Sequence, residues 1–364
     1  MAIPTSEIDL TQPFLRSSAV ASGMPASALR TSSYRRVFRG VYVGASTRMT
    51  PTVRVRAALL LVDPSAFASH ASAARLYDVP LPVLSDEHVS VTEPTLRRPR
   101  PGVRCHVCRD PDVRVVGGVR VSAPTQLFVE LSSMLGLVDL VAVGDHLVRH
   151  RLATIQELVA RCRSATGAVS LARRAAELVR ERVDSPMETR LRPLLVLAGL
   201  PEPEVNLTVR DVDGVPVRRY DLIYRDARTI VEYDGRHHIE REQTWESDLL
   251  RREAIDDDEW RILVVTSRGI YVDPAQTLER VWAALAQPPD ARRTEQAVGR
   301  VATALSGARL IRLRNSARDE LGPSGLRRGR HNSAGVELWG PSAEQRQQLG
   351  GAGEGDVERR ASRR

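Results

Sequence analysis

The sequence predicts a multidomain α/β protein, and three observations lead to this prediction. Residues 183–287 alternate helical and strand patterns in the order helix, three antiparallel strands, helix, strand, helix. Residues 1–50 combine two short helical patterns with a small basic strand. Between them, residues 51–182 mix helices and strands. In residues 288–364 one further helix is expected, followed by a disordered tail rich in Gly, Ser, Arg, Gln and Glu.

Residues 1–50 are expected to form a winged helix-turn-helix. Ser18–Ser22 and Pro25–Thr31 have short helical patterns, with a glycine turn between them. A basic segment then leads to the strand Val41-Tyr42-Val43. Helix, turn, helix and basic wing is a layout that binds DNA, because arginines at the wing neutralise phosphates. The candidate DNA-binding residues are Arg30, Arg35, Arg36 and Arg39. A solvated basic loop is the alternative interpretation.

The end of this segment carries a resemblance. Arg36-Val37-Phe38-Arg39-Gly40-Val41-Tyr42 is similar to the RxxRGVY-like hallmark in the N-terminal domain of abortive-infection antitoxins. The resemblance implies that the chain binds DNA and that a toxin–antitoxin or defence system supplies a partner.

Residues 51–182 are expected to form a mixed α/β segment that ends in a linker helix. Helices are expected at Arg54–Val62, 69–77, Pro124–Ser133, Leu137–Arg149 and Val169–Arg182, and strands at 88–92 and 116–122. The order loosely resembles the antitoxin-like proteins. Cys105 and Cys108 form a lone CxxC, which we interpret as two reduced cysteines rather than half a zinc site.

A β-hairpin is predicted near residue 226, with strands Val217–Tyr224 and Thr229–Asp234. If the turn is centred between Asp226 and Ala227, Leu222 faces Val231, and Tyr220 and Tyr224 lie on that same apolar face.

The other face of the hairpin pairs Ile223 with Ile230 and sets Asp221 opposite Glu232, where like charges repel. A cation between two such carboxylates removes the repulsion, and oxygen ligands suit Mg²⁺ or Mn²⁺. The register therefore predicts a metal site. The alternative is a surface hairpin whose carboxylates are neutralised by neighbouring arginines in solvent.

The segments around the hairpin complete the predicted element order. They are a helix from Ser185 to Gly199, a strand Glu204–Arg210, a turn at Asp213-Gly214, a helix at 239–255, a strand at 260–266 and a helix Pro274–Ala286. Glu188 has two interpretations that stay open. It is either the third residue of a capping box begun by Ser185, or a glutamate that completes the metal site from the first helix.

The order and residues resemble the PD-(D/E)xK nuclease superfamily, and more closely the bacterial domain related to very-short-patch repair endonucleases. The D…(D/E)xDGxxH pattern of those relatives is matched by Asp221, Glu232, Asp234, Gly235 and His238. The resemblance covers about residues 183–285 and implies a restriction-endonuclease-like αβββαβα core that hydrolyses DNA. It implies that Asp221 and Glu232 bind the metal, and that Asp234, His238 and Glu188 take part in catalysis.

The sequence departs from the superfamily pattern in one respect, and this departure leaves a second function open. The chain contains no lysine, so the motif lysine of the superfamily is missing, and Asp234 stands two residues after Glu232. Either His238 or a neighbouring side chain takes its role, or catalysis has been lost. In the latter case the protein is a DNA-binding regulator, an antitoxin-like repressor with a degenerate nuclease domain.

The composition indicates the kind of partner and the cellular compartment to expect. A net charge of +8 and a pI of about 10 indicate a polyanionic partner. No signal peptide is evident, no apolar run reaches the ~18 residues of a membrane span, and three cysteines argue against a disulfide framework. We therefore expect a cytoplasmic protein without a membrane partner, found at the nucleoid if it binds DNA. The oligomeric state is left open.

Overall fold

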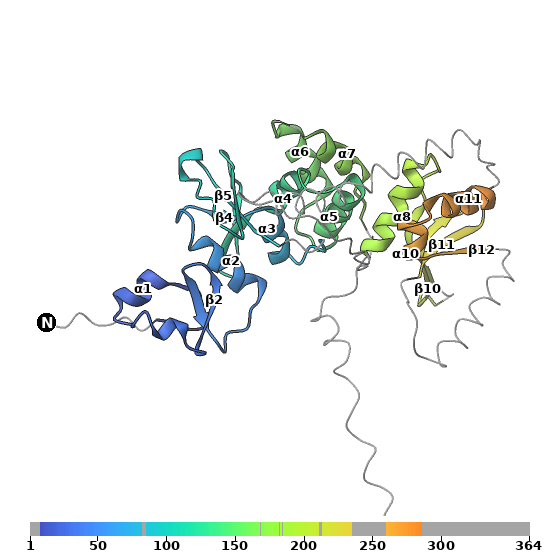
Figure 1. The fold of residues 1–364 in the computed structure, drawn as a ribbon. Coiled ribbons are helices and arrows are strands. Elements are labelled where there is room, and N and C mark those ends of the chain that lie inside the picture. Colours follow the sequence, from blue (N-terminus) through green and yellow to red (C-terminus); the bar gives the residue numbers. More distant parts are fainter. Residues whose placement is uncertain are drawn as a thin grey trace, which may run out of the picture. The chain divides into compact units, whose positions relative to one another are not determined.

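The computed structural model describes residues 8–81, 85–167, 169–181, 183, 185–210, 213–234 and 260–285 (Figure 1). Within them the chain has α/β architecture, with helices and three separate sheets. The expected helix at 239–255, His238 and the expected tail lie outside the described residues. No helix in the described ranges combines the length and apolarity needed to cross a membrane.

The N-terminal part is a small sheet with short helical segments. Its elements are β1 (Phe14–Leu15), α1 (Arg16–Ala21), the 3-10 helix η1 (Ala28–Arg30), β2 (Tyr34–Phe38) and β3 (Val41–Gly44). The strand order is β1-β3-β2, and β2 and β3 form an antiparallel hairpin. Gly40 at the hairpin turn has φ of 85°, a conformation that glycine adopts without a Cβ clash.

The prediction of a second helix at Pro25–Thr31 is wrong, because only the single turn η1 forms there. Leu29 is the buried residue of this turn, and it packs with Phe14 and Ala19. One buried side chain gives a short segment too little packing to offset the cost of helix nucleation, so the remainder stays a turn.

The middle part contains a five-stranded mixed sheet in the order β6-β5-β4-β8-β7. Its strands are β4 (Phe67–Ala68), β5 (Glu87–Val91), β6 (Val103–Val107), β7 (Val113–Val116) and β8 (Val119–Ser122). β5 pairs with β6 and β4 with β8 in parallel, and the other pairs are antiparallel. The single strand expected at 116–122 is instead the β7–β8 hairpin, because Gly117 and Gly118 with φ of 53° and 72° turn the chain back.

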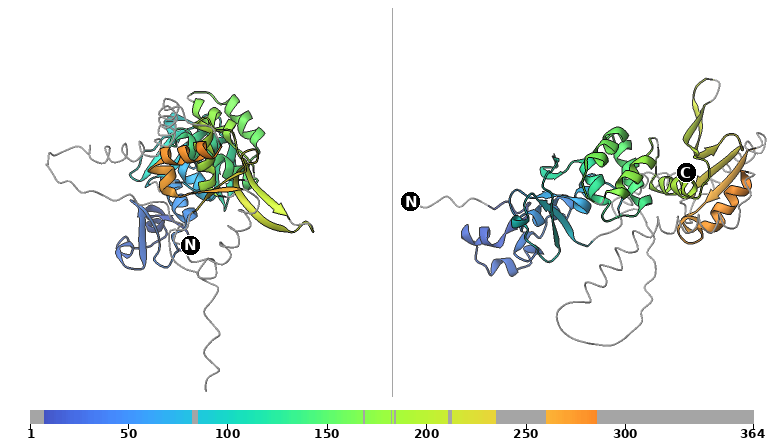
Figure 2. Two further views of the ribbon diagram at one scale, coloured as in Figure 1. Left: turned by 90° about the vertical axis from the view of Figure 1, so that its right-hand side faces the viewer. Right: turned by 90° about the horizontal axis from the view of Figure 1, so that it is seen from above.

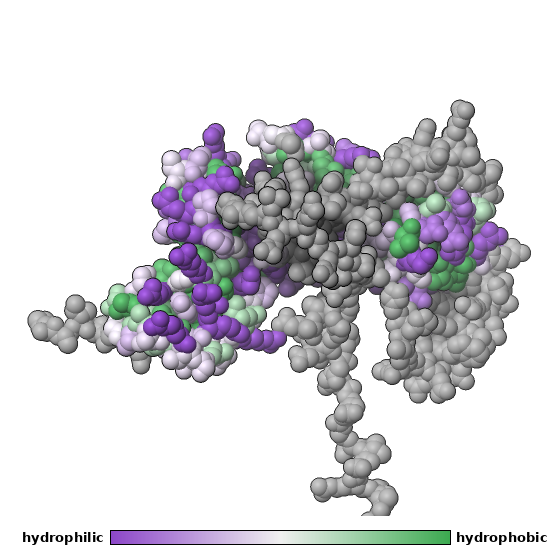
Figure 3. Space-filling view, viewed as in Figure 1, coloured by the Kyte–Doolittle hydropathy of each residue, from purple (hydrophilic) through white to green (hydrophobic). Residues whose placement is uncertain are grey.

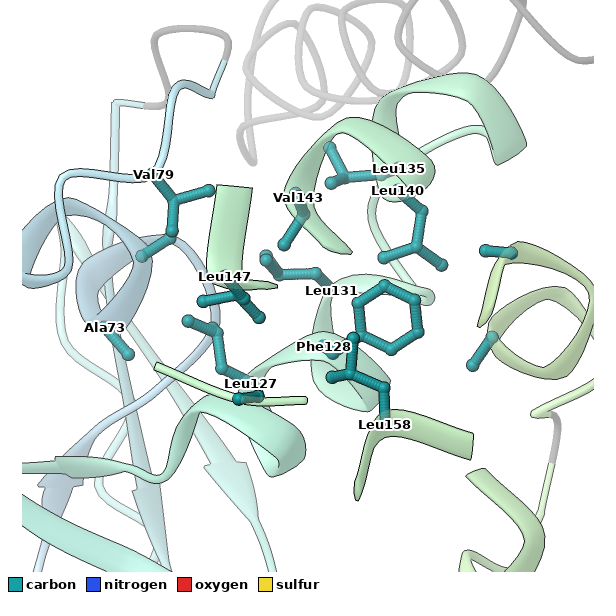
Figure 4. Packing of buried hydrophobic residues seen from close by; sticks show 14 of the residues in the cluster. Ala73, Val79, Leu127, Phe128, Leu131, Leu135, Leu140, Val143, Leu147 and Leu158 are labelled. Atoms are coloured by element: carbon teal, nitrogen blue, oxygen red, sulfur yellow. The ribbon is translucent and has the colours of Figure 1, made fainter. Parts of the chain in front are cut away.

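Helices pack beside this sheet around the largest apolar core. They are α2 (Pro51–Leu59), α3 (His70–Leu76), α4 (Pro124–Leu131), α5 (Leu137–Arg149), α6 (Ile155–Ser164) and α7 (Ser170–Leu178). Figure 4 shows Phe128 and Leu131 of α4 against Leu140 of α5 and Leu158 of α6, all fully buried. α6 was not expected from the sequence, although Thr154 and Glu157 form a complete capping box at its start.

The C-terminal part is a four-stranded sheet in the order β12-β11-β10-β9. Its elements are α8 (Pro186–Leu197), β9 (Glu204–Arg210), β10 (Pro216–Tyr224), β11 (Thr229–Tyr233), β12 (Arg261–Val265), α10 (Ser267–Tyr271) and α11 (Pro274–Ala284). β11 and β12 are parallel and the other pairs antiparallel. β10 pairs with β11 only near the turn, so the β9–β10 hairpin extends away from the other two strands (Figure 2).

One face of the C-terminal sheet carries its main core. Leu222, Tyr224 and Val231 pack there with apolar side chains of α8, α10 and α11. α8 also buries Arg190 and Arg192 completely. Both guanidinium groups bond to acidic residues of α5, and these contacts fix α8 against α5.

Candidate functional site

The hairpin register predicted from the sequence is confirmed where β10 and β11 pair. Leu222 pairs with Val231 and Tyr224 with Thr229. The ladder ends at Leu222, and the same register continued by one residue sets Asp221 opposite Glu232. Asp221 Oδ2 accepts a hydrogen bond of 2.9 Å from the Tyr233 backbone N–H. The carboxylate thus takes the place of a ladder partner at the point where the two strands separate.

The expectation that Tyr220 and Leu222 share one face is wrong. Tyr220 packs with Ile223 and Ile230, on the face away from α8, whereas Leu222 lies in the core beneath α8. On the neighbouring strand β9, Asn206 has a left-handed backbone with φ of 50°.

Glu188 extends this arrangement from α8. Its backbone N–H donates to Ser185 Oγ at 3.1 Å, so Ser185 caps the helix as expected. Its carboxylate Oε2 accepts from Asn206 Nδ2 at 3.0 Å, and Asn206 Oδ1 accepts from Arg219 Nε at 3.1 Å. The side chain therefore reaches toward the sheet from a helix that Ser185 caps, and both interpretations of Glu188 stay open.

We call Glu188, Asp221 and Glu232 the carboxylate edge. Glu188 is buried, and Asp221 and Glu232 are half-buried. Asp234, one residue beyond β11, is exposed, and its N–H donates to Val265 O at 2.9 Å. His238 lies outside the described residues. The donor set consists of carboxylate oxygens, which fits Mg²⁺ or Mn²⁺ in type.

The described residues do not gather these carboxylates into a closed ligand set. Only one group of three potential metal-ligating side chains among them has its ligand atoms within 4.8 Å of one another, and it contains no carboxylate.

A basic groove of about 1300 Å³ lies in the N-terminal part. Its five arginines come from α1, η1, the β2–β3 hairpin and the loop before β6, and we call it the arginine groove: Arg16, Arg30, Arg36, Arg39 and Arg100. Hydrophilic side chains are prominent on this part in Figure 3, at the lower left. Three of the four arginines chosen from the sequence line the groove. Arg35 instead donates to Thr47 O.

The group that sequence reasoning missed is His70, His88 and His106, the histidine cluster. His70 begins α3, His88 lies on β5 and His106 on β6. His88 Nδ1 and His106 Nε2 are 3.0 Å apart, and the His70 and His106 rings stack with centroids 3.8 Å apart. Three of the eight histidines of the chain fall between residues 70 and 106, and this local concentration is the sequence signal that could have pointed to the cluster.

Burial keeps the histidine cluster neutral. Loss of hydration lowers the pKa of His70 to about 4 and, together with the neighbouring imidazoles, the pKa of His88 to about 2 and of His106 to about 3. Neutral imidazole is the form that ligates metals.

Comparisons with known proteins add no assignment: no family model matches the chain, and no curated protein sequence matches it significantly.

Proposed function

We propose that the protein is a metal-dependent endonuclease that hydrolyses phosphodiester bonds in DNA, with the arginine groove as a DNA-binding surface. The observation that carries the proposal is the approach of carboxylates from α8, β10 and β11 at one place on the C-terminal sheet. By register, Asp221 lies between Asn206 of β9 and Glu232 of β11. Asn206 in turn holds the carboxylate of Glu188.

Mg²⁺ or Mn²⁺ would be held by Asp221 and Glu232, with Glu188 beside them. Such an ion polarises a phosphodiester and lowers the pKa of a coordinated water. The chain fixes its own groups in advance, because the Tyr233 N–H orients the Asp221 carboxylate and the Asn206 amide orients Glu188. Preorganised ligands of this kind need little rearrangement when substrate binds.

The remaining roles follow from charge and from the missing lysine. Arg219 donates to Asn206 Oδ1, so its positive charge lies beside the carboxylate edge and would offset the charge of a phosphate. Without a lysine in the chain, positioning and deprotonation of the attacking water fall to Asp234 or His238.

The arginine groove supports a nucleic-acid substrate. Side chains from separate elements place five guanidinium groups around one depression, and guanidinium is well suited to bind phosphate oxygens in pairs. This surface resembles, in its short helices and basic hairpin, the winged helix-turn-helix expected from the sequence. The rest of the endonuclease assignment draws on the αβββαβα order, of which the described residues contain every element but the helix expected at 239–255.

The alternative function is a DNA-binding regulator with a degenerate nuclease domain. It is favoured by the absence, among the described residues, of three carboxylates whose oxygens lie within 4.8 Å of one another. In that case the arginine groove acts alone, and the carboxylate edge has no catalytic use.

A cleavage assay separates the two functions. Supercoiled DNA is incubated with the full-length protein and Mg²⁺ or Mn²⁺, with a chelator as the metal-free control. We expect nicking that depends on the metal, and we expect Asp221→Asn to lower the nicking rate at least ~100-fold. The substitution removes one charged ligand of the metal, whose stabilisation of charge in the transition state is worth several kcal/mol. The matched control is Asp226→Asn, which alters an exposed carboxylate in the turn of the same hairpin.

Two results would count against the endonuclease. Equal cleavage by parent and Asp221→Asn would remove the carboxylate edge from the reaction. DNA binding without cleavage in either metal would support the regulator.

A further inference from the structure

The histidine cluster joins three elements that are distant in sequence. β5 and β6 are parallel, and their register pairs His88 with Arg104 and Ser90 with His106. His88 and His106 therefore lie two positions apart on one face of the sheet, because alternate residues of a strand share a face. His70, at the start of α3, stacks its ring on that of His106 from the helical layer.

We propose that His70, His88 and His106 bind a divalent transition metal of the Zn²⁺ class, at a site separate from the carboxylate edge. The ligand nitrogens of all three side chains already lie within 4.8 Å of one another. Two nitrogens bound to one tetrahedral Zn²⁺ are roughly 3.3 Å apart, given Zn–N distances of about 2.0–2.1 Å. His88 Nδ1 and His106 Nε2 are 3.0 Å apart, so a small opening of the rings accommodates the ion.

The side chains around His70 are placed to hold its ring in an orientation suited to metal binding. Its Nδ1 lies 3.1 Å from Ser69 Oγ and 3.8 Å from Glu130 Oε2, which leaves Nε2 available as the ligand nitrogen. A ligating histidine typically uses its second ring nitrogen in a hydrogen bond that fixes its orientation.

Glu130 is itself held in place. Its Oε1 accepts from Ser122 Oγ at 2.8 Å and from Gln126 Nε2 at 2.7 Å, and its Oε2 accepts from the His70 backbone N–H at 2.9 Å. Ser69 Oγ likewise accepts from Ser90 Oγ at 2.8 Å. The support around the cluster is therefore a connected network rather than a set of loose side chains.

The backbone of His70 lies in the left-handed region, with φ of 47°. This conformation is uncommon outside glycine, but histidine is among the residue types enriched in it. It occurs at the first residue of α3.

The donor set selects the metal. Three imidazole nitrogens suit Zn²⁺, Co²⁺, Ni²⁺ or Cu²⁺, whereas Mg²⁺ and Ca²⁺ require oxygen ligands. Three protein ligands also leave one tetrahedral position for a water molecule.

The test measures metal uptake by the full-length protein after removal of metal with a chelator. Elemental analysis after dialysis against Zn²⁺ should give about one ion per chain, and Co²⁺ should give the visible absorption of a four-coordinate site with nitrogen ligands. Zn²⁺ at a hundredfold excess over its Kd should raise the melting temperature by about 5 °C or more, whereas Mg²⁺ should not reproduce this shift.

Variants assign the ligands. His88→Gln and His106→Gln should each lower Zn²⁺ affinity at least ~100-fold, as loss of one of three ligands removes a bond to the ion. The control is His150→Gln, which removes an exposed histidine at the end of α5. Asp221→Asn should retain Zn²⁺ uptake, so this site and the proposed nuclease site are tested separately.

Three outcomes overturn the proposal, and the first two do not depend on how the variants fold. One is a metal-free parent protein that takes up neither Zn²⁺ nor Co²⁺. The other is a Co²⁺ spectrum with thiolate ligands, which would assign the ion to the cysteines instead. Uptake that survives in folded His88→Gln and His106→Gln would also contradict it.

Discussion

The carboxylate edge and the histidine cluster are both groups of polar side chains set among strands, but the chain assembles them differently. Asp221 and Glu232 lie one residue beyond the paired part of a tight hairpin, whose register set continued would place them opposite each other, and Glu188 comes from α8. The histidine cluster takes one residue each from α3, β5 and β6, and the two strands β5 and β6 are parallel. A hairpin fixes its partners through local register, whereas a parallel pair requires a crossover whose length does not reveal the register.

The two groups also differ in what they do to the fold. In the carboxylate edge, the continued hairpin register sets Asp221 opposite Glu232, and like charges so placed repel unless a cation lies between them. The histidine cluster is neutral and hydrogen-bonded, with His88 almost fully buried. We therefore expect substitutions in the first to affect activity more than stability, and substitutions in the second to do the reverse.

The largest effect expected from this contrast is on stability. His88→Leu should lower the free energy of unfolding by about 2 kcal/mol without metal, because it leaves Nε2 of the half-buried His106 without its partner. Glu232→Gln, at a half-buried position, should change it by roughly 0.5 kcal/mol or less. Thermal unfolding of the full-length variants measures both. Equal losses would erase the distinction between the two groups.

A second contrast lies within the N-terminal part, between arginines that are neighbours in sequence. Replacing Arg30, Arg36 and Arg39 with alanine should weaken DNA binding at least ~10-fold and reduce the slope of log K against log salt by up to about 2.7. Arg35→Ala should leave the slope unchanged, because Arg35 is bonded to Thr47 O and does not line the groove. Fluorescence anisotropy with duplex DNA across a salt series measures the slopes.

If Arg35→Ala flattens the salt dependence as much as the triple variant, DNA contacts the other face of β2. The arginine groove would then lose its assigned role.

The smallest expected effect is a gain. Asp221→Asn in metal-free buffer should raise the free energy of unfolding by at most about 1 kcal/mol, since it relieves repulsion with Glu232. Part of this gain is offset, because an amide oxygen is a weaker acceptor than a carboxylate for the Tyr233 N–H. Denaturant unfolding with and without Mg²⁺ measures the effect. A destabilisation in both buffers would mean that the hydrogen bond outweighs the repulsion.

Much of the secondary structure could be predicted from local signals. The helix expected at Leu137–Arg149 and the strand expected at Glu204–Arg210 have the same bounds in the structure. The first has an apolar stripe at helical spacing, and the second is followed by a strong Asp-Gly turn. Where the prediction fails, packing decides instead of pattern. Pro25–Thr31 has helical residues but buries only Leu29, so one turn forms.

The candidate site, like the secondary structure, could be predicted only as far as local sequence signals determine it. Local register was enough to set Asp221 against Glu232, but it could not reveal that Asn206 joins Glu188 to the same place. Tyr220 lies on the face opposite Leu222, which the simple alternation of strand residues does not anticipate. His106, which lies between Cys105 and Cys108, could not be recognised as part of a cluster, because its partners come from other elements.

The buried arginines of α8 limit how the chain can be divided. Arg190 donates to Asp139 Oδ1 at 2.8 Å and Arg192 to Asp145 Oδ2 at 3.3 Å, so two cations of the C-terminal part have their anions on α5. A fragment starting at residue 183 would expose α8 and remove both α5 carboxylates, leaving Arg192 only its ion pair with Glu202 at 3.3 Å. Grafting the C-terminal part into another protein would thus require one of two changes. Either α5 is transferred with it, or both ion pairs are replaced by apolar residues. Such a replacement of buried ion pairs often leaves stability equal or higher.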